Sequence, residues 1–156
     1  RDKVWRRRMP TMLPVRPDLK LLDLATGTGD QLLALYDSGK IVSGVGIDPA
    51  EKMLAIGREK IARRSLGDKL SLAVGAGECI PCGDKTFDVV TISFGIRNVT
   101  DVPKALREMH RVLKSGGRLA ISDIVATAEL PEEAKRDLAL YTGCMAGASL
   151  IAELEV

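Results

Sequence analysis

A glycine turn after an aliphatic run constrains the fold of this chain more than any other feature. Residues 19–25 are mostly aliphatic, and Gly27 and Gly29 then lead into a helical pattern. A second aliphatic run, residues 41–47, ends at Asp48. Parallel strands hold a nucleoside at their carboxyl ends in this way, because glycine lets the backbone approach the ligand and a carboxylate accepts hydrogen bonds from the ribose hydroxyls. The pattern therefore indicates a nucleoside-binding enzyme.

The glycine loop departs from a dinucleotide fingerprint in two respects. Leu32 stands where the third glycine of that fingerprint would be, and an acid, Asp23, lies inside the first strand, four residues before Gly27. A carboxylate at this place would repel a pyrophosphate. It suits the cationic amino-acid end of S-adenosylmethionine (SAM) instead. We therefore predict SAM as the cofactor.

Strand and helix patterns alternate along the rest of the chain, which predicts a mostly parallel sheet with helices on both faces. The predicted strands cover residues 19–25, 41–47, 70–74, 87–94 and 118–124. The predicted helices cover residues 30–38, 50–64, 102 to the glycine pair 116–117, and 131–145. The alternation therefore predicts an α/β fold.

Composition fits one domain, residues 1–156, with an aliphatic core. No apolar run approaches the about 20 residues of a membrane span, and a net charge of +2 indicates no nucleic-acid partner. The basic cluster in residues 1–8 could contact anionic lipid, but a solvated first helix is the simpler interpretation. Three cysteines without secretory features suggest the cytoplasm. Cys79 and Cys82 have zinc-ligand spacing but no second pair, so we expect no metal.

Five segments resemble the UbiE-like family of class I SAM-dependent methyltransferases, which C-methylate precursors of ubiquinone and menaquinone. They are residues 2–6, 22–30, 53–60, 87–101 and 105–119, and the run 87–101 is the most family-specific. The resemblance implies a Rossmann-like three-layer sandwich with strand order 3-2-1-4-5. It also implies methyl transfer to a small molecule, a demethylated quinol, by a cytoplasmic enzyme with at most peripheral membrane contact. The usual methyltransferase sheet carries two more strands beside the fifth. Their absence predicts an exposed edge, which a homo-oligomer would cover unless the chain is a fragment.

Two other functions stay open. Residues 130–148 resemble arsenite-methyltransferase-like proteins, in which a cysteine at the position of Cys144 helps to bind arsenic. Another small-molecule methyltransferase is therefore the first alternative. The family's upstream lid segment and its last strands are missing from the sequence, so the second alternative is a SAM-binding module without catalysis or an incomplete fragment.

The resemblance implies roles for the glycine loop and for the acid that ends the second strand. Gly27 and Gly29 would pass under the methionine part of SAM, and Asp23 would hold its ammonium group through backbone or water contacts. The sequence shows no other evident partner for Asp23. Asp48 would accept hydrogen bonds from both ribose hydroxyls, which a neutral or positive residue cannot replace.

The same resemblance places the adenine near two loops. Pro49 and Met53 would pack on the ring, although Met53 could equally be a core residue. Ala76 replaces the family's Asp or Asn, which normally binds the adenine amino group, so the backbone of Gly77 would have to reach the ring, with Glu78 at its rim. The complete expected cofactor site is Asp23, Ala25, Thr26, Gly27, Gly29, Asp48, Pro49, Met53, Ala76, Gly77, Glu78 and Ser93.

Catalysis of C-methylation needs a deprotonated ring oxygen and a group that stabilises it. Arg97 and Asn98 follow the fourth strand, so we expect Arg97 to stabilise a developing phenolate and Asn98 to donate a hydrogen bond. An alternative is structural: Arg97 would pair with Asp101, and Asn98 would cap the next helix. His110 is expected on the helix surface, and Asp123 is a second-tier catalytic candidate.

Overall fold

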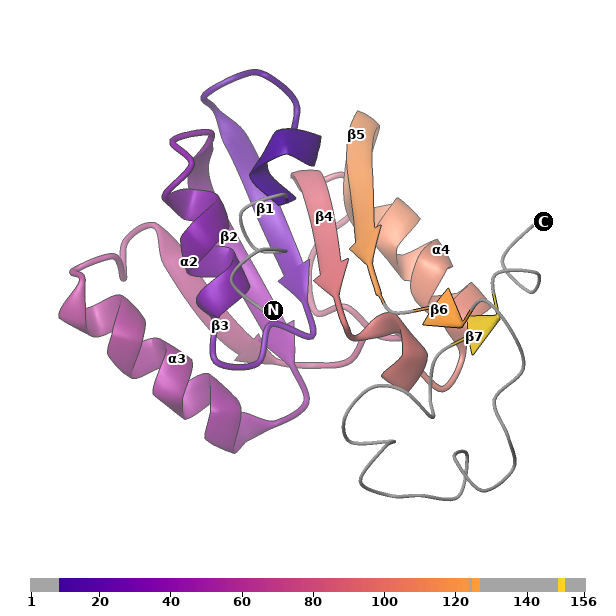
Figure 1. Ribbon diagram of the computed structural model, residues 1–156. Helices are drawn as coiled ribbons and strands as arrows, with labels where there is room; N and C mark the ends of the chain where they lie inside the picture. The colour runs from indigo at the N-terminus through magenta and orange to yellow at the C-terminus, as the bar shows by residue number, and fades with distance from the viewer. Residues whose placement is uncertain (1–8, 124, 127–148, 151–156) are drawn as a thin grey trace.

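The computed structural model describes residues 9–123, 125–126 and 149–150. Its centre is a parallel sheet of five strands in the order β3-β2-β1-β4-β5 (Figure 1). The strands are β1 Leu19–Leu24, β2 Ile41–Asp48, β3 Leu70–Val74, β4 Phe87–Ser93 and β5 Leu113–Ser122. The predicted α/β class and strand order are confirmed.

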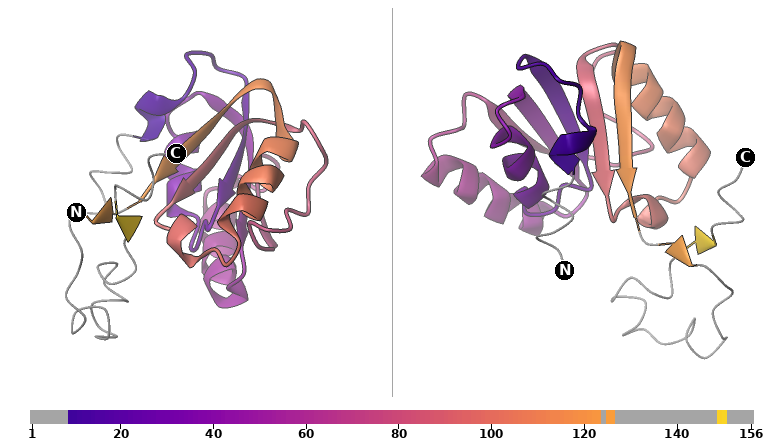
Figure 2. Two further views of the ribbon diagram at one scale, coloured as in Figure 1. Left: turned by 90° about the vertical axis from the view of Figure 1, so that its right-hand side faces the viewer. Right: turned by 45° about the horizontal axis from the view of Figure 1, so that its top comes forward.

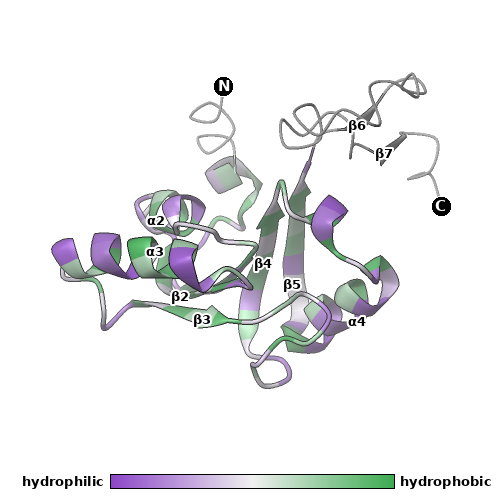
Figure 3. Ribbon diagram, turned by 90° about the horizontal axis from the view of Figure 1, so that it is seen from below, coloured by the Kyte–Doolittle hydropathy of each residue, from purple (hydrophilic) through white to green (hydrophobic). Residues whose placement is uncertain are grey.

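Helices cover both faces of this sheet, which gives the molecule three layers (Figure 2). They are α2 Asp30–Tyr36, α3 Glu51–Arg63 and α4 Val102–Val112, with a short 3₁₀ turn, η1, at Ile96–Asn98. Leucines of α2 pack on one face of β1 and β4, and Ala105, Met109 and Val112 of α4 pack on the other. Hydrophobic residues concentrate on the strands, while hydrophilic residues recur along α3 and α4 (Figure 3).

The central strands are buried on both sides, as parallel strands between helices should be. Paired residues of β1 and β4 alternate between the two cores: Leu21 and Val89 lie in one, Leu22 and Val90 in the other. The aliphatic runs therefore supply both cores at once. Because the strands are parallel, all their carboxyl ends meet at one edge of the sheet, where loops can form a site.

The end of α4 differs from the prediction. The helix stops at Val112 instead of at the glycine pair, and β5 starts at Leu113 instead of residue 118. The last helical carbonyls, those of Arg111 and Val112, accept hydrogen bonds from the amides of Lys85 and Thr86 just before β4. The chain thus joins the sheet early, and a register shift in the β4–β5 pairing accommodates the glycines that follow.

The described part of β5 is an edge of the main sheet, and its Leu119 and Ile121 are 36% and 42% exposed. The two-residue strands β6 Val125–Ala126 and β7 Ser149–Leu150 pair with each other and do not join this sheet. The predicted helix 131–145 and Cys144, on which the arsenite alternative depends, lie outside the described residues. Every helix within the described residues is too short or too polar to span a bilayer.

Candidate cofactor site

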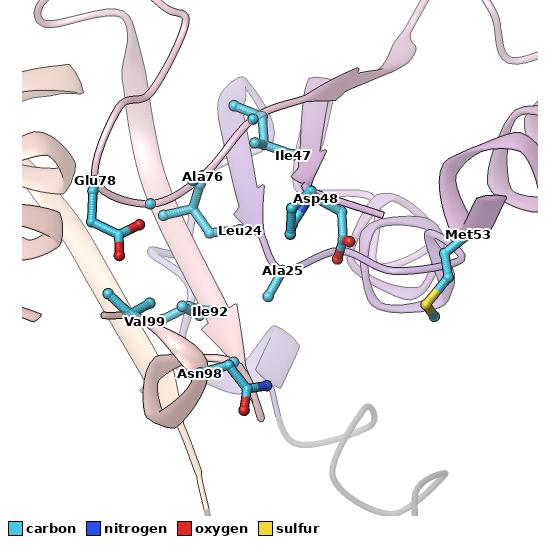
Figure 4. Close-up of a pocket in the computed structure, with 14 residues that line it drawn as sticks. Leu24, Ala25, Ile47, Asp48, Met53, Ala76, Glu78, Ile92, Asn98 and Val99 are labelled. Atoms are coloured by element: carbon cyan, nitrogen blue, oxygen red, sulfur yellow. The ribbon is translucent and has the colours of Figure 1, made fainter. Parts of the chain in front are cut away.

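A pocket of about 290 Å³ opens where the strands end, between the loops that follow β1, β2, β3 and β4. Figure 4 shows Asp48 and Met53 on one side of it and Glu78, Val99 and Asn98 on the other. Its lining residues are Leu24, Ala25, Ile47, Asp48, Pro49, Met53, Gly75, Ala76, Gly77, Glu78, Ile92, Gly95, Asn98 and Val99. Eight of the expected site residues thus come together: Ala25, Asp48, Pro49, Met53, Ala76, Gly77, Glu78 and Asn98. The lining set does not include Asp23, Thr26, Gly27, Gly29, Ser93 or Arg97.

Asp48 ties the pocket to the glycine loop. One carboxylate oxygen accepts a hydrogen bond from the amide of Gly27 at 2.9 Å, and the other accepts one from the amide of Ala50 at 2.8 Å. Asp48 is only 8% exposed, yet it lines the pocket. Each oxygen of a carboxylate has room for a second hydrogen bond. Asp48 can therefore hold the loop and still accept hydrogen bonds from a ligand.

The glycine loop takes left-handed backbone angles that glycine adopts without a steric penalty. Gly27 and Gly29 have φ angles of 55° and 73°. Gly27 also lies under Met53, whose terminal methyl would be 3.0 Å from a Cβ at that position. Both glycines stay outside the pocket lining, but the amide of Gly27 holds the loop against Asp48 at the pocket wall.

Ala25 adopts the same left-handed region, with φ 52°, at a cost of about 1 kcal/mol. The chain leaving β4 passes directly beside it at Gly95, where an added Cβ would lie 2.3 Å from the Cβ of Ala25. Gly95 is a pocket residue that the sequence analysis did not single out. The signal available in the sequence was a glycine directly after the predicted fourth strand.

Asp23 lies behind the pocket wall and does have protein partners, contrary to the sequence analysis. Its carboxylate accepts hydrogen bonds from the hydroxyls of Thr91 at 2.6 Å and Thr26 at 2.7 Å. Asp23 is 1% exposed. Burial raises its pKa to about 6, although the two threonine hydroxyls act in the opposite direction. The carboxylate thus stabilises the turn from β1 into the glycine loop.

The loop between β3 and β4 forms the opposite wall of the pocket. Glu78 holds it against the start of α4, because one carboxylate oxygen accepts hydrogen bonds from the amides of Thr100 at 2.8 Å and Asp101 at 3.3 Å. Backbone amides, its own first, lower the pKa of Glu78. The Ala76 carbonyl accepts a hydrogen bond from the Cys79 amide at 3.1 Å, which closes a tight turn. Glu78 therefore fixes the loop that forms this rim of the pocket.

Arg97 and Asn98 do not make the two structural interactions that the sequence suggested for them. Arg97 forms an ion pair with Asp123, not with Asp101. Asp101 itself caps α4, since its side chain accepts a hydrogen bond from the Lys104 amide at 2.9 Å. Asn98 is exposed and lines the pocket. The two suggested structural interactions, an Arg97–Asp101 pair and an Asn98 cap, are therefore wrong.

Three further residues were singled out for metal or acid–base chemistry. His110 is exposed on α4, as a surface histidine should be. Cys79 and Cys82 are free thiols. Among the residues that the structure describes, no three His, Cys, Asp or Glu side chains gather as a metal site would require.

Comparison of the sequence with models of known protein families identifies the family of this chain. The sequence model of the ubiE/COQ5 methyltransferase family matches residues 1–141. The chain belongs to this family. The resemblance seen in the sequence motifs is confirmed.

Named relatives agree with this assignment, and a solved structure shares the fold. The chain is 42% identical to the ubiquinone/menaquinone biosynthesis C-methyltransferase UbiE of Geotalea daltonii, over 77% of this chain and 52% of that protein. It is 38% identical to the demethylmenaquinone methyltransferase of Bacteroides fragilis, over 83% and 53%. It shares the fold of a SAM-dependent methyltransferase from Aquifex aeolicus, with a TM-score of 0.69 at 24% identity, covering 82% and 70%. The chain spans about half the length of the curated relatives it matches.

Proposed function

We propose that this chain is a SAM-dependent methyltransferase that methylates a ring carbon of a demethylated quinol in menaquinone or ubiquinone biosynthesis. The observation that carries the proposal is Asp48, a buried carboxylate that faces the pocket at the end of β2 and keeps hydrogen-bonding capacity on both oxygens. Membership of the ubiE/COQ5 family supplies the reaction class.

The residues present suit an adenosyl group. Asp48 would accept hydrogen bonds from the ribose hydroxyls, a role that needs a carboxylate close to a glycine loop. Ile47, Ile92 and Val99 give the pocket apolar walls against which a flat ring can pack. Ala76 offers no side-chain hydrogen bond to the adenine, so the backbone at Gly77 takes that role. SAM, when bound, supplies an electrophilic methyl group.

We assign the acceptor side of the site to the turn after β4. Ring-carbon methylation requires electron density from a deprotonated hydroxyl, so the protein must orient the ring and stabilise the developing charge on its oxygen. Asn98 can donate a hydrogen bond from its side-chain amide into the pocket. The Arg97 guanidinium, one residue away, supplies positive charge.

Because prenylated quinols partition into lipid, we also expect a cytoplasmic enzyme that contacts the membrane peripherally.

Calorimetric titration of SAM into the chain, followed by transfer of a labelled methyl group from SAM to a demethylated naphthoquinol, tests the proposal. Binding and labelled product support it. Binding without product from any quinol would favour the alternative of a SAM-binding module without catalysis. Absence of binding would refute the cofactor site.

Exchange of Asp37 for Asn provides a matched control for variants of Asp48. Asp37 is an exposed acid that follows the C-terminal end of α2 and pairs with Arg64 at 2.5 Å, and neither residue lines the pocket. Removing its charge changes the net charge of the protein as Asp48→Asn does, yet it should leave SAM binding unchanged. A loss of binding in both variants would mean that Asp48 acts only through general electrostatics or stability.

A further inference from the structure

The ends of β4 and β5 bring together two charged side chains that lie far apart in the sequence. Ser93 pairs with Ser122 in the parallel sheet, and the amide of Phe94 donates a hydrogen bond to the Ser122 carbonyl at 2.7 Å. Asp123 follows Ser122 directly, and Arg97 lies in η1 just after β4. The sheet pairing therefore determines that these two side chains meet.

The Arg97–Asp123 ion pair is buried. Their side chains are 9% and 8% exposed. The Arg97 guanidinium also lies 5.9 Å from the centre of the Phe94 ring, within range of a cation–π contact. A carboxylate on one side and an aromatic ring on the other thus restrain the guanidinium, and these contacts come from the ends of two neighbouring strands.

Asp123 is well placed to hold Arg97, whereas the nearer acid in the sequence is already engaged. Asp101 accepts the capping hydrogen bond of α4. A buried guanidinium that loses its carboxylate is strongly disfavoured and moves toward water. The position of the Arg97 charge therefore depends on Asp123.

The pocket wall depends on the same contact. Gly95, Asn98 and Val99 line the pocket, and Arg97 lies between them in the chain. Arg97 belongs to η1, and Asn98 is the residue of η1 that faces the pocket. The ion pair thus connects the end of β5 to the acceptor side of the site.

We propose that Asp123 is a positioning residue for methyl transfer, which acts through Arg97 and does not itself touch the acceptor. This inference rests on the proposed function, because it assigns the Arg97 charge to the acceptor oxygen. Asp123 fixes the guanidinium, and with it η1, in the orientation that the reaction needs.

Asp123→Asn tests the role, because it removes the charge while keeping the size of the side chain. We expect kcat for methyl transfer to fall between about tenfold and 100-fold, the range for a displaced catalytic group. The Kd for SAM should stay near the wild-type value, since Asp48 and the glycine loop are untouched. Asp123→Glu, which keeps the charge, should recover part of the loss.

Asp101→Asn is the matched control. It removes one negative charge from the same region, and asparagine caps helices about as well as aspartate. Its kcat and its melting temperature should stay near wild type. Equal losses in kcat, SAM affinity and melting temperature in Asp123→Asn would overturn the proposal, because they would show only a general loss of structure. A wild-type kcat in folded Asp123→Asn would overturn it as well.

NMR of the arginine side chain separates this inference from the proposed function. The Nη–H signals of Arg97, assigned by their loss in Arg97→Lys, should be protected from solvent exchange in the wild type and exposed in Asp123→Asn, because Nη1 is the atom that contacts Asp123. An unchanged signal refutes the positioning role even if methyl transfer is observed. A changed signal in a chain that binds SAM but methylates no quinol keeps Asp123 as the residue that positions Arg97 and refutes the proposed acceptor alone.

Discussion

Asp88 and Asp48 are buried to nearly the same extent, with 7% and 8% exposure, and lie toward opposite ends of the strands of one sheet. Their hydrogen-bond partners differ. Asp88, at the amino end of β4, accepts hydrogen bonds from Arg16 and from Lys114 as well as from the amide of Lys20. Asp48, at the carboxyl end of β2, accepts from two backbone amides.

The pKa of Asp88 reflects these contacts. Burial raises it, but the Lys20 amide and the charges of Lys114 and Arg16 outweigh burial and lower it below its usual range. Cations satisfy this carboxylate, which joins the segment before β1 to β4 and β5. Within the described residues the hydrogen-bond donors to Asp48 are backbone amides, and its carboxylate retains capacity for a ligand. Equal burial therefore does not mean equal function, and the bonding partners distinguish a structural acid from a binding acid.

The largest effect is expected from Asp48→Asn. Two hydrogen bonds from ribose hydroxyls to a charged acceptor weaken together, at about 1.5 kcal/mol each, so SAM affinity should fall about 100-fold. Isothermal titration calorimetry measures this. The comparison between the two acids fails if Asp88→Asn weakens SAM binding equally.

Asp23 is a third buried acid, whose carboxylate accepts hydrogen bonds from the hydroxyls of Thr26 and Thr91. It should make stability depend on pH. Its pKa in the folded protein, about 6, exceeds its ordinary value of 3.8. The folded state therefore binds the proton more tightly than the unfolded state. The stability from this group is complete below pH about 4 and is lost as pH rises through about 6, by about 3 kcal/mol in all.

Urea unfolding of wild type and Asp23→Asn between pH 4 and pH 7 isolates this contribution. The difference in unfolding free energy between the two proteins should change with pH in the stated direction. Acids whose pKa is lowered, such as Glu108 and Asp88, lose stability as pH falls, and they cancel in the comparison because both proteins contain them. A pH-independent difference would contradict the assignment.

Gly95→Ala tests the packing that shapes the pocket. The new methyl group would lie 2.3 Å from the Cβ of Ala25, so the turn after β4 must shift. We expect a loss of about 2 kcal/mol in unfolding free energy. Ala25→Gly in the same chain should recover most of it, because it removes the clashing atom and the strained φ angle. Thermal unfolding of the two single variants and the double variant measures the energetic coupling between positions 25 and 95. Additive effects of the two substitutions on stability would exclude direct contact.

Asp88→Asn should have the smallest effect, a loss of about 1 kcal/mol in unfolding free energy. Arg16 and Lys114 are 50% and 40% exposed, so water partly screens their attraction to the carboxylate. SAM affinity should not change. High salt should shrink the stability difference between wild type and variant. Chemical unfolding at two salt concentrations checks this, and a salt-independent difference would mean that packing matters more than charge.

Local sequence patterns were sufficient for the scaffold of the site. The strand at Leu70–Val74 was predicted with its observed bounds, and the alternation of aliphatic runs with helical patterns predicted the parallel sheet. The strand order came from the resemblance to SAM-dependent methyltransferases. Asp48 was found because it ends a strand next to a glycine loop, and its place follows from parallel pairing. The predicted end of α4 at the glycine pair 116–117 was wrong, because the amides of Lys85 and Thr86 donate hydrogen bonds to the last carbonyls of the helix.

Contacts between distant segments were beyond such patterns. Arg97 has acids on both sides in the sequence, and only the pairing of β4 with β5 selects Asp123. Thr91, a partner of Asp23, is 68 residues away, and Arg16 lies 72 residues from Asp88. The close approach of Gly95 to Ala25 likewise depends on how two neighbouring strands leave the sheet.

The sequence by itself determined the α/β sheet, the glycine loop and the acid at the end of β2, because periodicity and turn chemistry act over a few residues. Tertiary structure alone decided which carboxylates are satisfied by cations, by hydroxyls or by amides. Those partners come from segments that the sheet brings together, and the free energy of a buried charge depends on what surrounds it in space.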